Sequence, residues 1–339
     1  MGGLLQRIDM WQRRHGWLAF PFAVVKKFGE DQAGNLAALI AYYAIFSIFP
    51  LLLALSTILG YVLAGHPSWQ HDVTNSALSN IPLVGNNQPP PLHGNLAALV
   101  VGLALAVWSG LGIAKTAQTA FNTVYLVAHT DRPNFVKKTL RAIGLVVVGG
   151  LGLILTTIIS SAVTSVSTIG GVHVGVGLRI AGTLIAIGLN TALFLVLFQW
   201  LTVRDVTWRD AAPGALMSAV ALQILQLAAS AFIAHKLKGA QTTYGNFATV
   251  IVLLSWFYLQ AQVVLLSAEV NVVRRYKLWP RALKDPPATE ADFRAYEAYA
   301  ERERYQPEED VDTAFPDEPA FAQEAKSHAP AQTRRGPQR

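Results

Sequence analysis

Residues 244–271 read YGNFATVIVLLSWFYLQAQVVLLSAEVN, and this stretch decides the fold. A helix of this length is roughly 40 Å long, which is more than the apolar thickness of a bilayer. Glu269 is the one carboxylate in any long apolar stretch of the sequence. Ser255, Gln262 and Glu269 recur at intervals of seven, so on a helix they share one face with Tyr258. Because lipid disfavours such a polar face, we expect it to point toward other helices or water.

The composition of the whole chain agrees with a membrane protein. Its 339 residues are 52% hydrophobic and 14% charged, with a mean hydropathy of +0.35, whereas soluble domains have about 25% charged residues. There are no cysteines, so disulfides and thiolate chemistry are excluded. The eight histidines are scattered without ligand spacing, so we expect no metal centre and no other cofactor.

Five further apolar stretches precede the quoted one. They cover residues 36–64, a segment from 95 past Trp108, and residues 140–165, 179–203 and 211–235. Pro50 falls inside the first, where it removes a backbone donor and predicts a kink or a helix break. The sequence therefore predicts an all-α, polytopic protein with six transmembrane helices and a kinked first span.

Lysine and arginine are distributed unevenly between the two sides that these six spans define. The N-terminus, 113–141, 204–210 and 274–284 hold 17 of them, whereas the other three connections hold only Arg179, Lys236 and Lys238. The positive-inside rule therefore predicts that both termini are cytoplasmic.

Three regions follow from these patterns. Residues 1–35 form a cytoplasmic or interfacial segment in which aromatic side chains among basic ones predict contact with the membrane surface, namely Trp11, Trp17, Phe20 and Phe22. Residues 36–275 form the six-helix domain. Residues 285–339 carry a net charge of −6 and are expected to be largely disordered, with one polar helix from Thr289 to about Tyr305.

Glu269 is placed by its depth near the cytoplasmic boundary, roughly 35 Å along the helix from Asn246. Lys115 lies at a similar depth on the second span, so we predict an interfacial ion pair between Glu269 and Lys115, with Arg141 as the second choice of partner. The alternative is a solvated interfacial glutamate that has no partner.

A set of neutral polar residues lies nearer the middle of the spans: Asn190, Gln223, Gln226, Ser255 and Tyr258. These side chains either hold helices together, at about 0.6 kcal/mol per contact, or line a polar cavity. No Asp, Glu, His, Lys or Arg falls at the same depth, which argues against a proton pump built on a carboxylate relay.

Three pieces of the sequence together resemble the YihY/BrkB family of bacterial inner-membrane proteins. They are AYYAIFSIFPLLLAL at 41–55, the segment from Trp108 to Tyr125 ending in TAFNTVY, and the segment from Trp208 through PGAL to Asn271. The likeness covers about residues 20–275. It implies a multi-pass protein of the bacterial inner (plasma) membrane, whereas the function of the family is not settled, its members having been labelled ribonuclease BN and virulence factor.

Two functions compete, and a third is disfavoured. A transporter- or flippase-like protein for an unidentified lipid, envelope precursor or small solute would need the polar cavity. A structural or accessory envelope protein would instead be a packed bundle that acts through partners. Ribonuclease activity is not expected, because no catalytic residues, acid–base set or metal cluster are visible. The predicted partners are membrane lipids, especially anionic headgroups at the cytoplasmic face, and an unknown substrate, but no nucleic acid. The Gly-rich third span allows oligomers.

Overall fold

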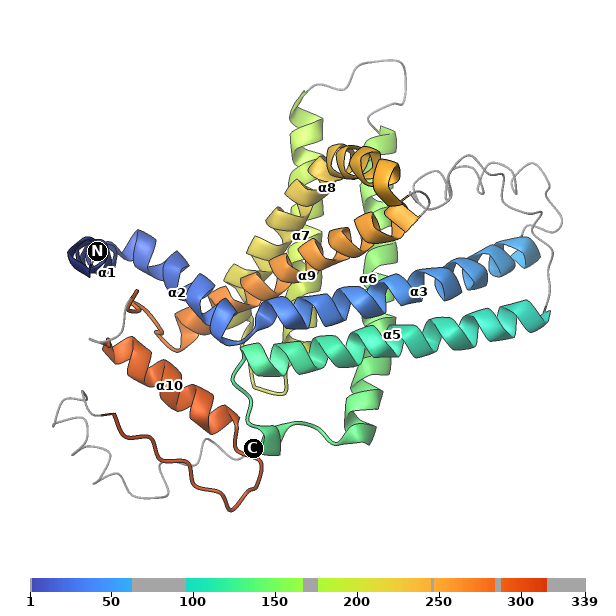
Figure 1. Cartoon of the computed structure of the whole chain (residues 1–339). Helices are drawn as coiled ribbons and strands as arrows, with labels where there is room; N and C mark the ends of the chain where they lie inside the picture. The colour runs from blue at the N-terminus through green and yellow to red at the C-terminus, as the bar shows by residue number, and fades with distance from the viewer. Residues whose placement is uncertain (1, 63–95, 167–175, 245–246, 284–287, 316–339) are drawn as a thin grey trace. The chain divides into compact units, whose positions relative to one another are not determined.

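The computed structural model describes residues 2–62, 96–166, 176–244, 247–283 and 288–315. All regular structure within these ranges is helical, as predicted (Figure 1). The long helices are α3 (Ala33–Val62), α5 (Leu96–Val124), α6 (Phe135–Val166), α7 (Val176–Leu201), α8 (Trp208–Tyr244) and α9 (Ala248–Arg275).

Each predicted span corresponds to one of these helices, but the ends differ. The largest difference is at α8, which continues about nine residues beyond the predicted end at 235, through HKLKGAQTTY to Tyr244. The extension is polar, so hydropathy did not predict it. Its residues are nevertheless compatible with a helix, since Gly239 alone is tolerated at a modest cost.

Membrane-spanning character is clear for three of the helices. Segments Val100–Val124, Ile180–Leu201 and Val250–Arg275 are long and apolar enough to cross a bilayer, and Ala33–Ile48 is a shorter apolar helix. The prediction of six spans is not confirmed by this measure. The described residues therefore establish an all-helical protein with three candidate spans.

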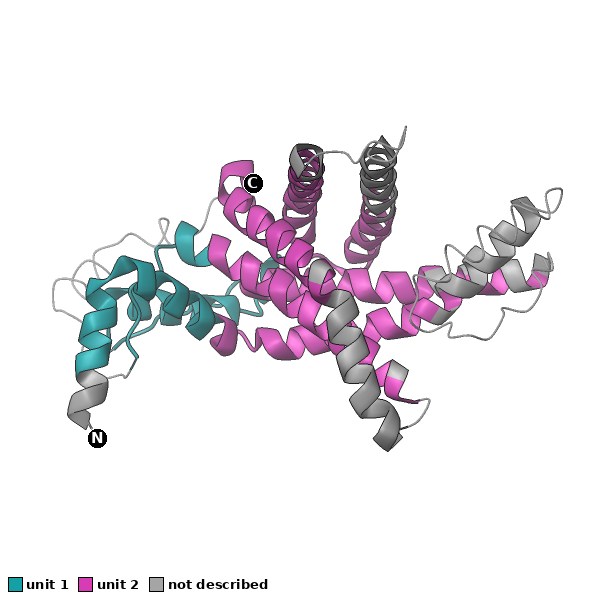
Figure 2. Ribbon diagram, turned by 90° about the horizontal axis from the view of Figure 1, so that it is seen from above, with its two compact units in different colours: residues 1–27, 126–132, 272–339 teal, residues 28–125, 133–271 magenta. Residues whose placement is uncertain are grey.

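The chain divides into two compact units (Figure 2). The larger unit contains residues 28–125 and 133–271. Within it α3 packs along α5, α5 along α6, α6 along α7, and α7 along α8, and Figure 1 shows α3 and α5 side by side. Glycines of α6 allow side chains of α7 to approach its backbone closely: Trp200 at Gly144 and Leu193 at Gly152.

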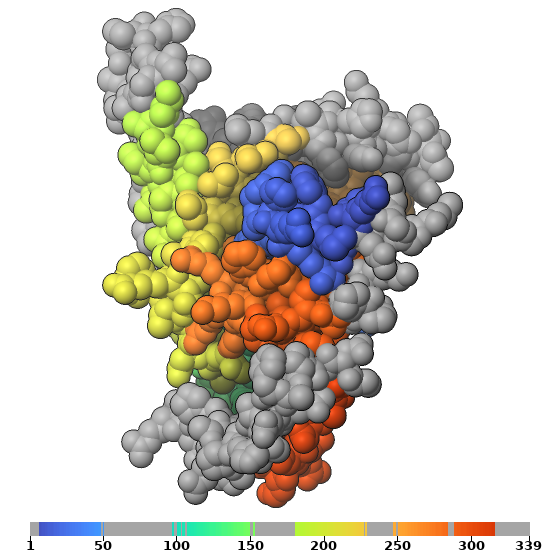
Figure 3. All heavy atoms as spheres, turned by 90° about the vertical axis from the view of Figure 1, so that its left-hand side faces the viewer, coloured from blue at the N-terminus to red at the C-terminus, as the bar shows by residue number. Residues whose placement is uncertain are grey.

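The smaller unit is built from three separate parts of the chain: residues 1–27, 126–132 and 272–339. It contains α1 (Gly2–Arg14), most of α2 (Gly16–Glu30), the short 3₁₀ helix η1 (His129–Asp131) and α10 (Glu290–Arg302). Figure 3 shows the N-terminal residues in blue directly against the orange C-terminal ones. The two regions that the sequence delimits at 1–35 and 285–339 both contribute residues to this unit.

The predicted polar helix of the tail is α10. Thr289 is its N-cap and forms a capping box with Asp292, which explains why the helix begins there. Beyond the helix, Phe315 packs against Phe293 and Tyr296, so residues after α10 also have tertiary contacts. Residues 316–339 lie outside the described part of the chain, and their predicted disorder stays a prediction.

Candidate functional site

The predicted cavity residues lie on three helices of the larger unit. Asn190 on α7 and Gln223 on α8 are half-buried, as is Tyr258 on α9. Gln226 on α8 and Ser255 on α9 are exposed. The prediction that these residues line one cavity is not tested by their positions, because burial does not show that they face a common space.

Two of these side chains have defined neighbours. The Ser255 hydroxyl donates to the Ile251 carbonyl oxygen of its own helix at 2.8 Å, so its hydrogen is already used within α9. The Tyr258 hydroxyl lies beside Gly34, 3.6 Å from where a Cβ would stand. Tyr258 therefore reaches the first turn of α3.

Glu269 is completely buried in α9. The alternative of a solvated interfacial glutamate is therefore wrong, because the helix packing around its side chain leaves no access to solvent. Lys115 is half-buried, and its ammonium lies 4.7 Å from the ring centroid of Phe135 at the start of α6. The ion pair between Glu269 and Lys115, or Arg141, stays a prediction.

Pro50 lies inside α3, whose helical backbone continues from Ala33 to Val62. The helix is therefore not broken at Pro50. A kink at Pro50 stays a prediction.

A buried polar knot joins the ends of α5, α8 and α9, and the sequence analysis assigned no role to its members. The Asn271 side chain accepts a hydrogen bond from the Gly214 backbone N–H at 2.7 Å and donates one to the Tyr125 hydroxyl at 3.1 Å. Asn271, Gly214 and Tyr125 are all buried. A Cβ on Gly214 would overlap the Ser267 carbonyl and the Asn271 amide, so only glycine fits this contact.

A second buried asparagine ties α5 to the segment after α7. The Asn122 side chain accepts from the Val203 backbone N–H at 3.0 Å and from the Thr202 hydroxyl at 3.4 Å. The spacing of Gln118 and Asn122 on one helix face gave a sequence signal for such a contact. The partners could not be found that way, because they are some 80 residues further along the chain.

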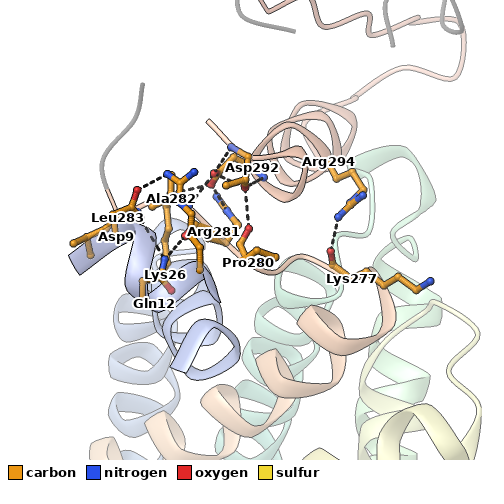
Figure 4. A network of polar contacts seen from close by, with 12 residues as sticks. Asp9, Gln12, Lys26, Lys277, Pro280, Arg281, Ala282, Leu283, Asp292 and Arg294 are labelled. Carbon is orange, nitrogen blue, oxygen red and sulfur yellow. Dashed lines mark hydrogen bonds and ion pairs between the residues drawn. The ribbon is translucent and has the colours of Figure 1, made fainter. Parts of the chain in front are cut away.

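A charged network organises the smaller unit around Asp292 (Figure 4). The Arg281 and Lys26 side chains both donate to its carboxylate, as do the Ala282 backbone N–H and the Thr289 hydroxyl. Burial by itself would raise the pKa of Asp292, but these hydrogen bonds outweigh it and hold that pKa well below its usual range.

The tail also contacts the connection between α5 and α6. The His129 ring stacks on Tyr305 with 4.3 Å between ring centroids, and the Thr130 N–H donates to the Arg304 carbonyl at 3.2 Å. Burial and the neighbouring Arg132 lower the pKa of His129, so the imidazole is mostly neutral at pH 7.

In the parts of the chain with described positions, no group of three or more histidines and carboxylates is arranged to hold a metal. The knot is made of neutral hydrogen-bonding groups, and the carboxylate of Asp292 is fully engaged by donors. Both clusters hold distant segments together.

Comparisons with known proteins point to the same class of molecule. The matching relatives are membrane proteins from bacteria: a UPF0761 membrane protein from Psychrobacter sp. (strain PRwf-1), 25% identical, covers 80% of this chain and 51% of its own length. Another from Acinetobacter baylyi is 25% identical over 80% of this chain and 65% of its own. Inner membrane protein YhjD of Escherichia coli (strain K12) is 22% identical over 79% of this chain and 85% of its own.

Apolar helices long enough to cross a bilayer, together with these relatives, define an integral membrane protein. The family model of virulence factor BrkB matches residues 24–292, and the chain belongs to that family. The resemblance stated from the sequence is thereby confirmed. The chain spans about half to two thirds of the length of the two UPF0761 relatives. No solved structure matches it significantly.

Two of the three stretches that carry the resemblance, Trp108–Tyr125 and Trp208–Asn271, meet in the polar knot. Tyr125 ends TAFNTVY, Gly214 belongs to PGAL, and Asn271 ends the stretch quoted first. These motifs are therefore parts of one hydrogen-bonded contact between helix ends.

Proposed function

We propose that this protein is a six-span protein of the bacterial inner membrane, with both termini in the cytoplasm, that moves a lipid, an envelope precursor or a small solute across the bilayer. One observation carries the proposal: Gln226 is exposed on α8, where the residues beside it in the sequence are apolar. Ser255 is exposed on α9, and Asn190 and Gln223 are half-buried.

The exposure of these side chains argues against a role limited to holding helices together. An amide that holds two helices together is buried between them, because its hydrogen bonds then replace bonds to water. An amide exposed to hydrocarbon would leave donors and acceptors without partners. A polar path used by a headgroup or solute would supply partners to Gln226.

Asn190 and Gln223 extend this path. They lie on neighbouring antiparallel helices, at roughly 17 and 23 Å from the connection between α7 and α8 by the helical rise. The path would then run along α7, α8 and α9.

The test uses purified protein in liposomes that contain fluorescently labelled phospholipid. Accessibility of the label to an impermeant reductant reports movement between leaflets. We expect Gln226→Leu to slow the movement about tenfold, the effect of losing about 1.4 kcal/mol of hydrogen bonding along the path. Ile224→Leu is the matched control, because Ile224 is also exposed on α8 and is apolar.

Two results would contradict transport of lipids. One is movement no faster than in protein-free liposomes, and the other is equal rates for wild type and Gln226→Leu. Uptake assays with labelled solutes in the same vesicles then decide whether a small solute is moved instead.

An accessory role is the second candidate, and the folded smaller unit favours it. Its buried charged network holds three parts of the chain in one folded unit, and a cytoplasmic partner could recognise the outer surface of that unit. The two roles separate in a deletion strain. An accessory protein would lose function with Asp292→Asn, which loosens this unit, and keep it with Gln226→Leu. A transporter would instead lose function with Gln226→Leu.

Nuclease activity is outside the proposed function. We do not propose it because no acid–base set of the kind that RNA cleavage needs is recognisable in the sequence. Cleavage of RNA by purified protein, lost on replacement of Lys115 or Glu269, would overturn this conclusion.

A further inference from the structure

The polar side of α1 faces the protein. Asp9 and Gln12 are buried. The Asp9 carboxylate accepts from the Leu283 backbone N–H at 2.8 Å, and the Gln12 amide donates to the Arg281 carbonyl at 2.7 Å. These bonds to the segment before α10 fix the rotation of α1 about its axis.

The opposite side of α1 is apolar and basic. Arg7, Met10, Trp11 and Arg14 follow the i, i+3, i+4, i+7 spacing of one helix face and are all exposed. Met10 is 54% exposed and Trp11 52%, and Trp17 at the start of α2 is 69% exposed. This arrangement is the reverse of a helix in a soluble domain, which buries its apolar face.

We propose that this outward face, made of Arg7, Met10, Trp11, Arg14 and Trp17, lies in the headgroup region of a bilayer that contains anionic lipids. Tryptophan rings are favoured at headgroup depth, where the ring is in apolar surroundings and the indole N–H meets water. Arginines on the same face attract anionic headgroups. The protein is an integral membrane protein, so the same chain is already embedded in a bilayer to which this face can bind.

The charge of this outward face favours a bilayer, and not a second copy of the chain, as its partner. The face carries two arginines and no carboxylate, so a symmetric contact between two copies would bring like charges together. The sequence predicted surface contact for four aromatic residues, but the structure divides them. Phe20 packs edge-on against Trp279 at 5.9 Å and Phe22 is half-buried, whereas Trp11 and Trp17 point outward.

The absence of native cysteines allows a direct test in the full-length protein. Met10→Cys carries an environment-sensitive NBD label in nanodiscs of phosphatidylcholine, with or without phosphatidylglycerol. We expect blue-shifted emission, and quenching by spin-labelled lipid, that are strongest with phosphatidylglycerol. Glu308→Cys is the matched control, because Glu308 is an exposed residue of the same unit in an acidic segment, and its label stays water-like.

The basic residues are tested in the Met10→Cys background. Arg7→Gln with Arg14→Gln is expected to reduce quenching severalfold, while Arg294→Gln on α10 leaves it unchanged. The thermal stability of each variant is measured, and only variants as stable as the Met10→Cys parent are compared, so that unfolding is not mistaken for loss of binding.

Three results would overturn the proposal. Equal emission from labels at positions 10 and 308 would show that the face stays in water. Quenching independent of both phosphatidylglycerol and the two arginines would exclude anionic lipid as the partner. Shielding in detergent that increases with protein concentration would assign the face to a second copy.

Discussion

At the scale of single residues, the polar knot depends on one glycine. Gly214 brings α8 so close to α9 that its N–H reaches the Asn271 side chain. The same amide then holds the Tyr125 hydroxyl. Removing a partner of a buried amide lowers stability by more than the hydrogen bond itself contributes, because a buried polar group is then left unsatisfied.

Gly214→Ala is expected to destabilise the protein by about 2 kcal/mol, because the added methyl overlaps the Ser267 carbonyl and the Asn271 amide and overpacks the contact. Gly149→Ala in α6 is the matched control, since a Cβ there meets nothing within 4 Å. That control is expected to be neutral, or to stabilise by about 0.5 kcal/mol through helix propensity. Thermal unfolding of the detergent-purified proteins measures both, and equal midpoints would contradict the role of the knot.

At the scale of elements, α10 is held by its first turn. Asp292 closes the capping box with Thr289 and also accepts from Arg281 and Lys26. The Arg281 side chain is fully buried, so removing its carboxylate partner would leave a buried positive charge. The sequence predicted the helix from local pattern but not these partners, which lie on α2 and in the segment after α9.

Asp292→Asn is expected to cost about 3 kcal/mol in the stability of the smaller unit. Glu290→Gln is the control, since Glu290 is exposed and its pairing with Arg294 at 3.8 Å contributes little. Hydrogen exchange of the α10 amides measures the loss, and similar exchange in both variants would be inconsistent with a central role for Asp292.

The loss of stability caused by Asp292→Asn is also predicted to depend on pH. The pKa of Asp292 is lowered in the folded state, so its stabilising effect is fully present above the unfolded value of about 3.9. The effect is lost as pH falls below that value toward the folded pKa. The difference in stability of the smaller unit between wild type and Asp292→Asn should therefore be constant from neutral pH down to about pH 5. It should decrease at lower pH.

At the scale of the whole molecule, the arrangement across the membrane is the main prediction. Six spans with both termini inside would place Asn134 and Glu308 in the cytoplasm, and residues 65–94 outside. Single cysteines at Asn134, Glu308 and Ser76 in this cysteine-free chain test it with an impermeant maleimide. We expect Ser76→Cys to react in intact spheroplasts and the other two to react only after permeabilisation. Any other pattern would revise the number or direction of spans.

Local patterns in the sequence were enough to predict the helices, the membrane class and the family. Hydropathy, helix length and turn residues are properties of neighbouring residues, so the six apolar stretches predicted the six long helices to within a few residues at most ends. The local pattern also predicted α10. The polar end of α8 was missed because its residues carry no apolar signal.

The tertiary structure supplied the contacts between these elements. It brought Tyr125, Gly214 and Asn271 together in the knot, buried Glu269, and joined residues 1–27, 126–132 and 272–339 into one unit. It also showed that α1 turns its polar side inward and its tryptophan outward. The reason is that contact energies between residues far apart in the chain depend on shape and hydrogen-bond geometry, which the local composition of either segment does not contain.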